Sequence, residues 1–208
     1  MDKKLLELID KTDFESLFNK LNYVFFTKGD YNLNIIGIRN LLDGPVTDNT
    51  FNDALVVLYK VNGKWEKYVW EFTTDPGITS LTKPVNSNGC AILKPGQYRN
   101  VYKLDYHKNK YIALCQRLGP VTVYRDNNKN NILDFILTKT ETGYFGVNIH
   151  KAGTDSLYVN SWSAGCQVFK KENNFNTFIT LCKRAEKIYG NNFTYTLLIT
   201  DELINNLN

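Results

Sequence analysis

His150 and Cys166 lie sixteen positions apart in the last third of the chain, and the cysteine directly follows Gly165. A cysteine attacks as its thiolate, and a neighbouring histidine can lower the thiol pKa and accept its proton. A glycine before the nucleophile leaves room for backbone N–H groups to face a developing oxyanion. We therefore interpret this segment as a candidate site for cysteine-dependent acyl transfer.

The segment before the histidine indicates which way its side chain points. Phe145, Val147 and Ile149 recur at every second position, so in a strand they share one apolar face. Asn148 and His150 then share the opposite face. We expect that face to point away from the core and to border a cleft.

The other three cysteines are interpreted as small buried hydrophobic residues: Cys90, Cys115 and Cys182. Cys166 differs from them because its neighbours are small or polar rather than a continuous apolar run. The cysteines form no CxxC pair, and the chain has two histidines, so neither a zinc knuckle nor a multi-histidine zinc site is indicated. We expect no metal and no cofactor.

His150, a loop of twelve residues and then Ser163-Ala164-Gly165-Cys166 follow one another in an order that resembles the active-site signature of the L,D-transpeptidase catalytic domain. In that family a cysteine attacks a stem peptide of peptidoglycan. The resemblance therefore implies that Cys166 is the nucleophile and His150 its base. It also implies that Ser163 is the Ser/Thr of the signature, and that the amides of Gly165 and Cys166 form the oxyanion hole.

The sequence departs from the family pattern beside the cysteine. A second histidine usually precedes the Gly-Cys pair, and Ala164 stands there; an arginine usually follows the cysteine by two positions, and Val168 stands there. We expect Arg125 to hold a substrate carboxylate in place of that arginine. Asn148 and Trp162 are the other residues expected to support or bind the substrate. The two replacements favour hydrolysis over cross-linking.

The sequence thus predicts a cysteine peptidase, of the kind found in phage lysins, that acts on peptidoglycan stem peptides. Two alternatives stay open: an L,D-transpeptidase that forms cross-links, and a non-catalytic virion or cell-surface protein that uses the same fold for binding. The first residues have no apolar stretch long enough for a signal peptide, and no stretch approaches a membrane span. We expect action on the cell wall after release, or as a virion component.

The composition indicates a globular protein with a full core. The chain has 208 residues, of which 43% are hydrophobic. Its net charge of +4 is spread over single lysines, whereas a nucleic-acid-binding protein would carry a clustered basic stripe. We expect neither nucleic acid nor a membrane as partner, and the sequence leaves the oligomeric state open.

The hydrophobic pattern predicts a mostly β protein with few helices, which suits the twisted sheet sandwich or barrel that the resemblance implies. Residues 1–30 are expected to form a helical appendage, with a capping box that begins at Thr12, and residues 31–208 the catalytic domain. A helix should begin at Asn174 and end at Gly190, and a short helix should end the chain. Strands are predicted at 33–39, 54–60, 64–72, 90–93, 110–116, 121–124, 132–137, 145–150, 167–169 and 193–200, with Asn62-Gly63 as a hairpin turn.

One polar loop, from Asp126 to Asp134, has oxygen-bearing side chains at positions 1, 3, 5 and 9 of a calcium-loop pattern. Asn131 and Leu137 replace the glycine and glutamate that such loops carry at positions 6 and 12. A polar hairpin tip is the alternative, since Asn and Asp tolerate turn geometry.

Overall fold

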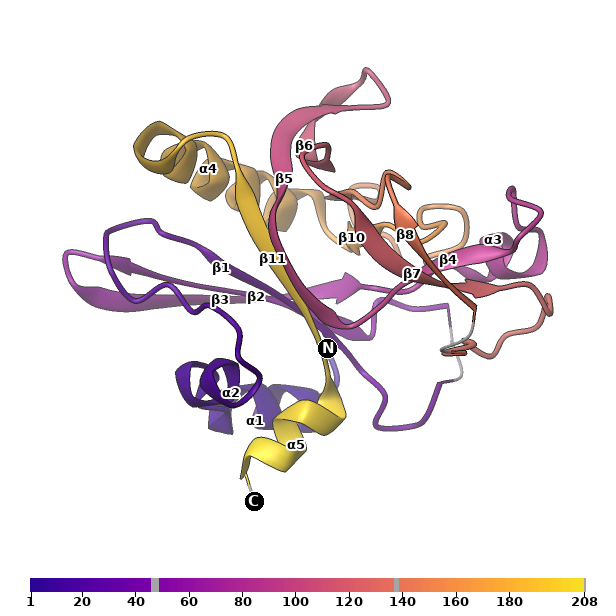
Figure 1. Cartoon of the computed structure of the whole chain (residues 1–208), viewed down its shortest axis with the longest axis horizontal. Coiled ribbons are helices and arrows are strands. Elements are labelled where there is room, and N and C mark those ends of the chain that lie inside the picture. Colours follow the sequence, from indigo (N-terminus) through magenta and orange to yellow (C-terminus); the bar gives the residue numbers. More distant parts are fainter. Residues whose placement is uncertain (46–48, 137–138, 208) are drawn as a thin grey trace.

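The computed structural model describes residues 1–45, 49–136 and 139–207. Within these residues the protein is mostly β, with a closed mixed barrel, a small sheet and helices at both ends of the chain (Figure 1). The barrel strands follow in the order β1 (Asn34–Arg39), β11 (Phe193–Ile199), β5 (Gly96–His107), β6 (Tyr111–Gln116), β9 (Ile149–Lys151), β10 (Gln167–Phe169), β3 (Lys64–Thr73) and β2 (Asp53–Val61). The small sheet has the order β4 (Cys90–Leu93), β7 (Val121–Asp126) and β8 (Thr140–Gly143).

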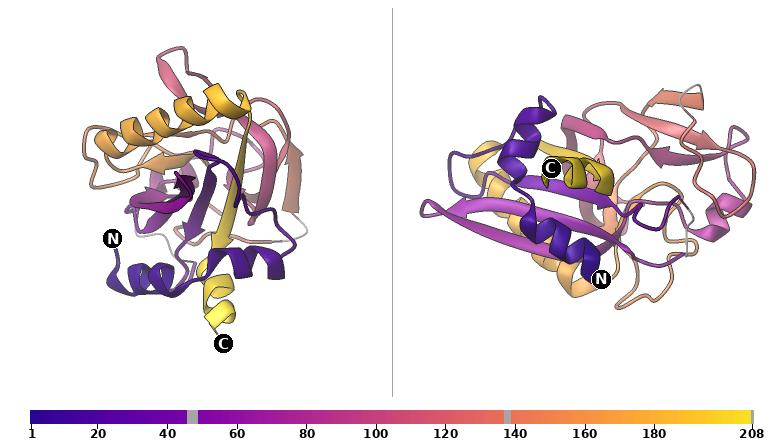
Figure 2. Two further views of the ribbon diagram at one scale, coloured as in Figure 1. Left: turned by 90° about the vertical axis from the view of Figure 1, so that its left-hand side faces the viewer. Right: turned by 90° about the horizontal axis from the view of Figure 1, so that it is seen from below.

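Helices lie on two opposite sides of the barrel (Figure 2). On one side are α1 (Lys3–Lys11), α2 (Phe14–Lys20) and α5 (Thr200–Leu207), and on the other is α4 (Glu172–Tyr189). A short helix, α3 (Ile78–Thr82), adjoins the small sheet. The two helical layers explain why strand β1 is buried throughout. Ile35 packs in the core inside the barrel, whereas Ile36 and Ile38 pack against the terminal helices in a second core.

The helix boundaries differ from the predicted ones where the caps differ. The predicted capping box at Thr12 is wrong by one residue, because Asp13 caps α2 and accepts the backbone N–H of Ser16 at 3.1 Å. The prediction that α4 begins at Asn174 is also wrong. Strand β10 leads almost directly into this helix, so α4 begins at Glu172, whose charge suits a helix N-terminus. Gly190 ends α4 with φ +86°, as predicted.

Local pattern predicts most strands well, and its failures have simple causes. The hairpin turn at Asn62-Gly63 is confirmed, with φ of +50° and +77°. Strand β5 is missing from the prediction because it mixes polar and apolar residues without clean alternation. The predicted strand at 132–137 is wrong for its described residues, 132–136, which have no strand; Leu137 lies outside the described residues. Of the predicted strand at 145–150, only the end lies in β9.

Candidate active site

The predicted base, His150, lies in strand β9, and the predicted nucleophile, Cys166, directly precedes the neighbouring strand β10. Strands β9 and β10 run parallel, with Val168 opposite His150, and the Gln167 backbone N–H donates to the Asn148 carbonyl at 2.9 Å. Cys166, which directly precedes β10, packs against the apolar cluster that contains Val168. Within the described residues no hydrogen bond joins the Cys166 and His150 side chains. The Cys166 thiol instead donates to the Gly146 carbonyl, with Sγ 3.4 Å from the oxygen.

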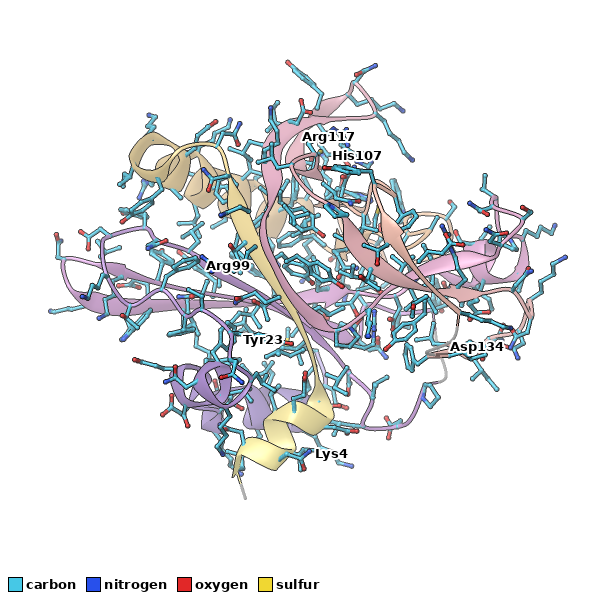
Figure 3. The ribbon with its side chains drawn as sticks, viewed as in Figure 1. Lys4, Tyr23, Arg99, His107, Arg117 and Asp134 are labelled. Carbon is cyan, nitrogen blue, oxygen red and sulfur yellow. The ribbon has the colours of Figure 1, made fainter. Side chains whose placement is uncertain are left out.

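The face that carries Asn148 and His150 is not an open cleft wall, contrary to prediction. Both residues are buried, because His107, at the end of β5, covers them. The His107 and His150 rings stack with their centroids 4.3 Å apart and their planes at 23°. Figure 3 shows His107 close to Arg117, near the β5–β6 hairpin.

The hydrogen bonds of His150 determine which ring nitrogen carries its proton. Nδ1 lies 2.8 Å from the carbonyl oxygen of Lys151, which can only accept, so Nδ1 carries the proton and Nε2 keeps its lone pair. Burial, followed by the neighbouring His107, lowers the pKa of His150 from 6.5 to about 3. The ring is therefore neutral at physiological pH, with Nε2 as a proton acceptor.

Asn148 joins the two histidine-bearing strands to β6. Its Oδ1 accepts the Gln116 backbone N–H at 2.9 Å, and its Nδ2 donates to His107 Nδ1 at 3.1 Å. His107 therefore accepts at Nδ1 and carries its proton on Nε2. Burial, followed by the charges of Lys108 and Arg117, lowers the pKa of His107 to about 4.

Cys166 is partly exposed, whereas the other three cysteines are buried, as the sequence predicts. Burial raises the pKa of the Cys166 thiol; the Asn148 backbone N–H and the Lys108 charge act against that rise. The resting site thus pairs a neutral thiol with a neutral imidazole. It does not hold a preformed thiolate–imidazolium pair.

The turn before the cysteine is fixed by Ser163 and Gly165. The Ser163 hydroxyl donates to the Cys166 carbonyl at 2.7 Å and accepts the Gly165 N–H at 3.2 Å. Gly165 has φ +120°, and a Cβ there would lie 2.3 Å from the Ala91 carbonyl oxygen. The Gly165 amide is therefore occupied, whereas the Cys166 N–H has no hydrogen-bond partner among the described residues. Of the two amides named by the resemblance, only that of Cys166 is free to meet an oxyanion.

A cavity of about 330 Å³ lies beside Ala164, next to the Gly-Cys turn. Arg125, assigned to a substrate carboxylate, lies in its wall. However, Arg125 donates through Nε and Nη2 to Glu141 Oε2, at 2.9 and 2.8 Å, and its guanidinium lies over the Phe145 ring. Glu141 already balances its charge. The rest of the cavity wall is formed by Ser80, Val85, Asn86, Gly89, Cys90, Ala91, Tyr144 and Phe145.

The remaining predicted residues lie farther from the reacting groups. The Trp162 side chain is 46% exposed, on the loop between β9 and β10, where it is open to a ligand. In the polar loop, Asn128 donates to Asp134 at 2.8 Å, and its Oδ1 accepts the Asn130 N–H. Such hydrogen bonds are typical of Asn and Asp in turns. Among the described residues, no group of three or more metal-ligating side chains occurs.

Sequence reasoning missed the roles of His107 and Gln116. His107 is given no role by the sequence pattern, although it is the only other histidine in the chain. The Gln116 side chain accepts the N–H groups of Phe145 and Val147 at 3.1 Å each, and so holds the segment that leads to Asn148. No local pattern marks such a residue, because its partners are about thirty positions away in sequence.

We compared the chain with known protein families, with curated proteins and with solved structures, and none of them matches it. No helix in the described part of the chain is long and apolar enough to cross a membrane.

Proposed function

We propose that this chain is a cysteine-dependent acyl-transfer enzyme with an L,D-transpeptidase-like catalytic domain, acting on peptidoglycan stem peptides. One observation carries the proposal: His150 lies opposite Val168, two residues after Cys166, and its Nδ1 is bonded to the Lys151 carbonyl, which leaves Nε2 as a base. The barrel with its few helices is compatible with such a domain. The partial exposure of Cys166 and the cavity beside the neighbouring Ala164 support access for a peptide.

The proposed reaction begins when Cys166 Sγ attacks an amide carbonyl and His150 Nε2 takes the thiol proton. The free Cys166 N–H donates to the resulting oxyanion. Collapse of this intermediate breaks the C–N bond, and His150 gives its proton to the leaving amine. Water, deprotonated by His150, then attacks the thioester, and the products are a carboxylic acid and the restored thiol.

In the free protein both the Cys166 thiol and the His150 imidazole are neutral, which affects how the reaction begins. Since the Cys166 thiol bonds to the Gly146 carbonyl, it must turn toward His150 when the substrate binds. Catalytic hydrogen bonds that are loose in a free enzyme commonly tighten in its substrate complex. We therefore propose a general-base pathway, in which proton transfer and attack occur together.

We further propose that water, rather than an amine, resolves the acyl-enzyme. Val168 and Ala164 stand where the family has an arginine and a histidine, and Arg125 is already paired with Glu141. Fewer charged groups are thus available to order a second peptide strand. A hydrolase of this kind would act on the wall after release from a cell, or as part of a virion.

The test is mass spectrometry of purified muropeptides incubated with the protein. Cys166→Ala should abolish turnover, because loss of a nucleophile commonly costs about 10⁴-fold or more. Cys182→Ala, which removes a buried thiol from α4, is the matched control and should stay active. Wild-type activity in Cys166→Ala would overturn the mechanism. A product profile dominated by cross-linked dimers would assign the enzyme to the transpeptidases instead.

A second candidate is a non-catalytic binding protein that retains this fold at a virion or cell surface. The raised pKa of the Cys166 thiol and its bond to the Gly146 carbonyl favour this binding role, because both keep the sulfur protonated, and a protonated thiol is a poor nucleophile. This candidate predicts that the wild-type protein binds peptidoglycan but leaves muropeptides unchanged in the same assay.

A further inference from the structure

The His107 ring occupies one whole face of the proposed base. It reaches His150 from the end of the β5–β6 hairpin, whose turn residues, Lys108 and Asn109, have φ of +49° and +55°. The Lys110 N–H donates to the His107 carbonyl at 3.0 Å, so Lys108 and Asn109 are the central residues of a tight β-turn. With centroids 4.3 Å apart and only 5% of His107 exposed, the two rings have little freedom to rotate.

A chain of hydrogen bonds fixes the orientation of the His107 ring. The Gln116 backbone N–H can only donate, so the atom of Asn148 that faces it is the carbonyl oxygen. The amide nitrogen of Asn148 then faces His107 and donates to its Nδ1. This order leaves His107 with its proton on Nε2, the opposite tautomer to that of His150.

From this arrangement we infer that His107 is a positioning residue for the proposed reaction: held by Asn148 and stacked on His150, it keeps the His150 ring neutral and oriented with Nε2 available to the Cys166 thiol. The inference rests on the proposed function for its catalytic consequence. It does not rest on it for the structural claim, which concerns the tautomer and protonation of His150.

The charged groups around the two rings act in the same direction as the stack. Lys108 on the hairpin turn and Arg117 at the end of β6 both disfavour a cation on His107, and Lys108 also disfavours one on His150. The nearby acid, Asp105, is paired with Arg117 at 3.1 Å.

Two further neighbours complete this environment. Lys151 forms an ion pair with Glu172, and Tyr111 contacts His107 through its ring, with the centroids 5.6 Å apart. No carboxylate among the described residues forms an ion pair with either histidine. Of the groups named here, only the Lys151 carbonyl, which bonds to His150 Nδ1, favours a proton on His150.

The experiment combines kinetics on purified muropeptides with ¹⁵N NMR of the imidazole groups. The chain has two histidines, so His107→Phe assigns both sets of signals. We expect wild-type His150 to be protonated on Nδ1 and to stay neutral down to about pH 4. His107→Ala removes the stack, so kcat should fall about 100-fold with little change in KM, and the pKa of His150 should move toward its ordinary value of 6.5.

His107→Phe keeps an aromatic ring in the stack, so it should retain most of kcat and the Nδ1–H tautomer of His150. Tyr106→Ala is the matched control, because its side chain is exposed next to His107, and it should behave as wild type. Unchanged kcat and unchanged titration of His150 in His107→Ala would overturn the inference, as would an Nε2–H tautomer in the wild type. If wild-type protein leaves muropeptides intact, the proposed function fails, and the NMR result still decides the role of His107.

Discussion

Gly165, before the candidate nucleophile, has a backbone conformation and a close neighbour that exclude a side chain. Its φ of +120° is rarely adopted by residues with side chains, and the Ala91 carbonyl occupies the space where a Cβ would lie. The glycine before the cysteine is thus required by two backbone constraints. It allows the loop to turn against the edge of β4 and so presents the Cys166 N–H.

We predict that Gly165→Ala destabilises the protein by about 3 kcal/mol or more, because backbone strain and a backbone clash act together. Gly146→Ala is the matched control. Gly146 also has positive φ, at +70°, but no atom lies within 4 Å of the place a Cβ would take there, so the substitution should cost about 1 kcal/mol. Urea unfolding of the two variants measures the difference. Equal losses would show that the approach to Ala91 is not tight.

At the scale of elements, the site depends on one long and two very short strands. Strand β5 spans twelve residues and delivers His107, whereas β9 and β10 have three residues each. Strand β9 was predicted only at Ile149 and His150, the end of the alternating apolar run, and β10 was predicted over its three residues. The contact between His107 and His150 was not predictable, because it joins residues 43 positions apart (150 − 107) through a barrel pairing.

The segment before β9 is held by side-chain bonds rather than by a sheet. Gln116 accepts from Phe145 and Val147, and its Nε2 donates to the carbonyls of Gly119 and Gly143. The apolar alternation correctly predicts which way the side chains of this segment point: Val147 lies in the core, and Asn148 lies on the opposite face. Strand pairing did not follow, because among the described residues no named strand pairs with 145–148.

Gln116→Leu should therefore release this segment. The substitution leaves two N–H groups and two carbonyls without their partner, at a cost of about 2–4 kcal/mol, and hydrogen exchange should accelerate at Phe145 and Val147. Gln97→Leu is the matched control, because Gln97 holds the backbone of Val24 in a similar way. It should accelerate exchange at Val24 only. Unchanged exchange at Phe145 and Val147 in Gln116→Leu would contradict the assigned role.

Across the whole molecule, a buried arginine joins the barrel to the small sheet. Arg39, at the end of β1, pairs with Asp75 at 2.7 Å and donates to the Leu93 carbonyl of β4 at 3.0 Å. Next to it, Asp53 is buried and accepts from Asn40 and Thr74. The bond from Arg39 to Leu93 holds β4, the strand whose Ala91 lies against Gly165. It also leaves Arg39, Asp53 and Asp75 buried together.

These buried groups determine how stability depends on pH. The folded-state pKa values of His150 and His107, about 3 and about 4, lie below the unfolded value of 6.5, so the unfolded chain binds two protons near pH 5.5 that the folded chain does not. Asp53 acts oppositely. Burial and then the neighbouring Asp75 raise its pKa from 3.8 to about 7, so the folded chain keeps one proton that the unfolded chain releases. Stability from Asp53 is lost as the pH rises toward 7, and stability from the histidines is lost as it falls below 6.5.

Each histidine that stays neutral in the fold should lower the free energy of unfolding by up to about 1.4 kcal/mol for each pH unit of acidification near pH 5.5, and the proton held by Asp53 acts against that fall. His107→Phe removes one of the two histidine protons, so the slope of its stability against pH should be smaller than that of the wild type by about 1.4 kcal/mol per pH unit. Urea unfolding of both proteins at several values between about pH 5 and 6.5 measures the two slopes. Equal slopes would mean that His107 is not kept neutral by the fold, and the buried histidine stack would then have no effect on proton binding.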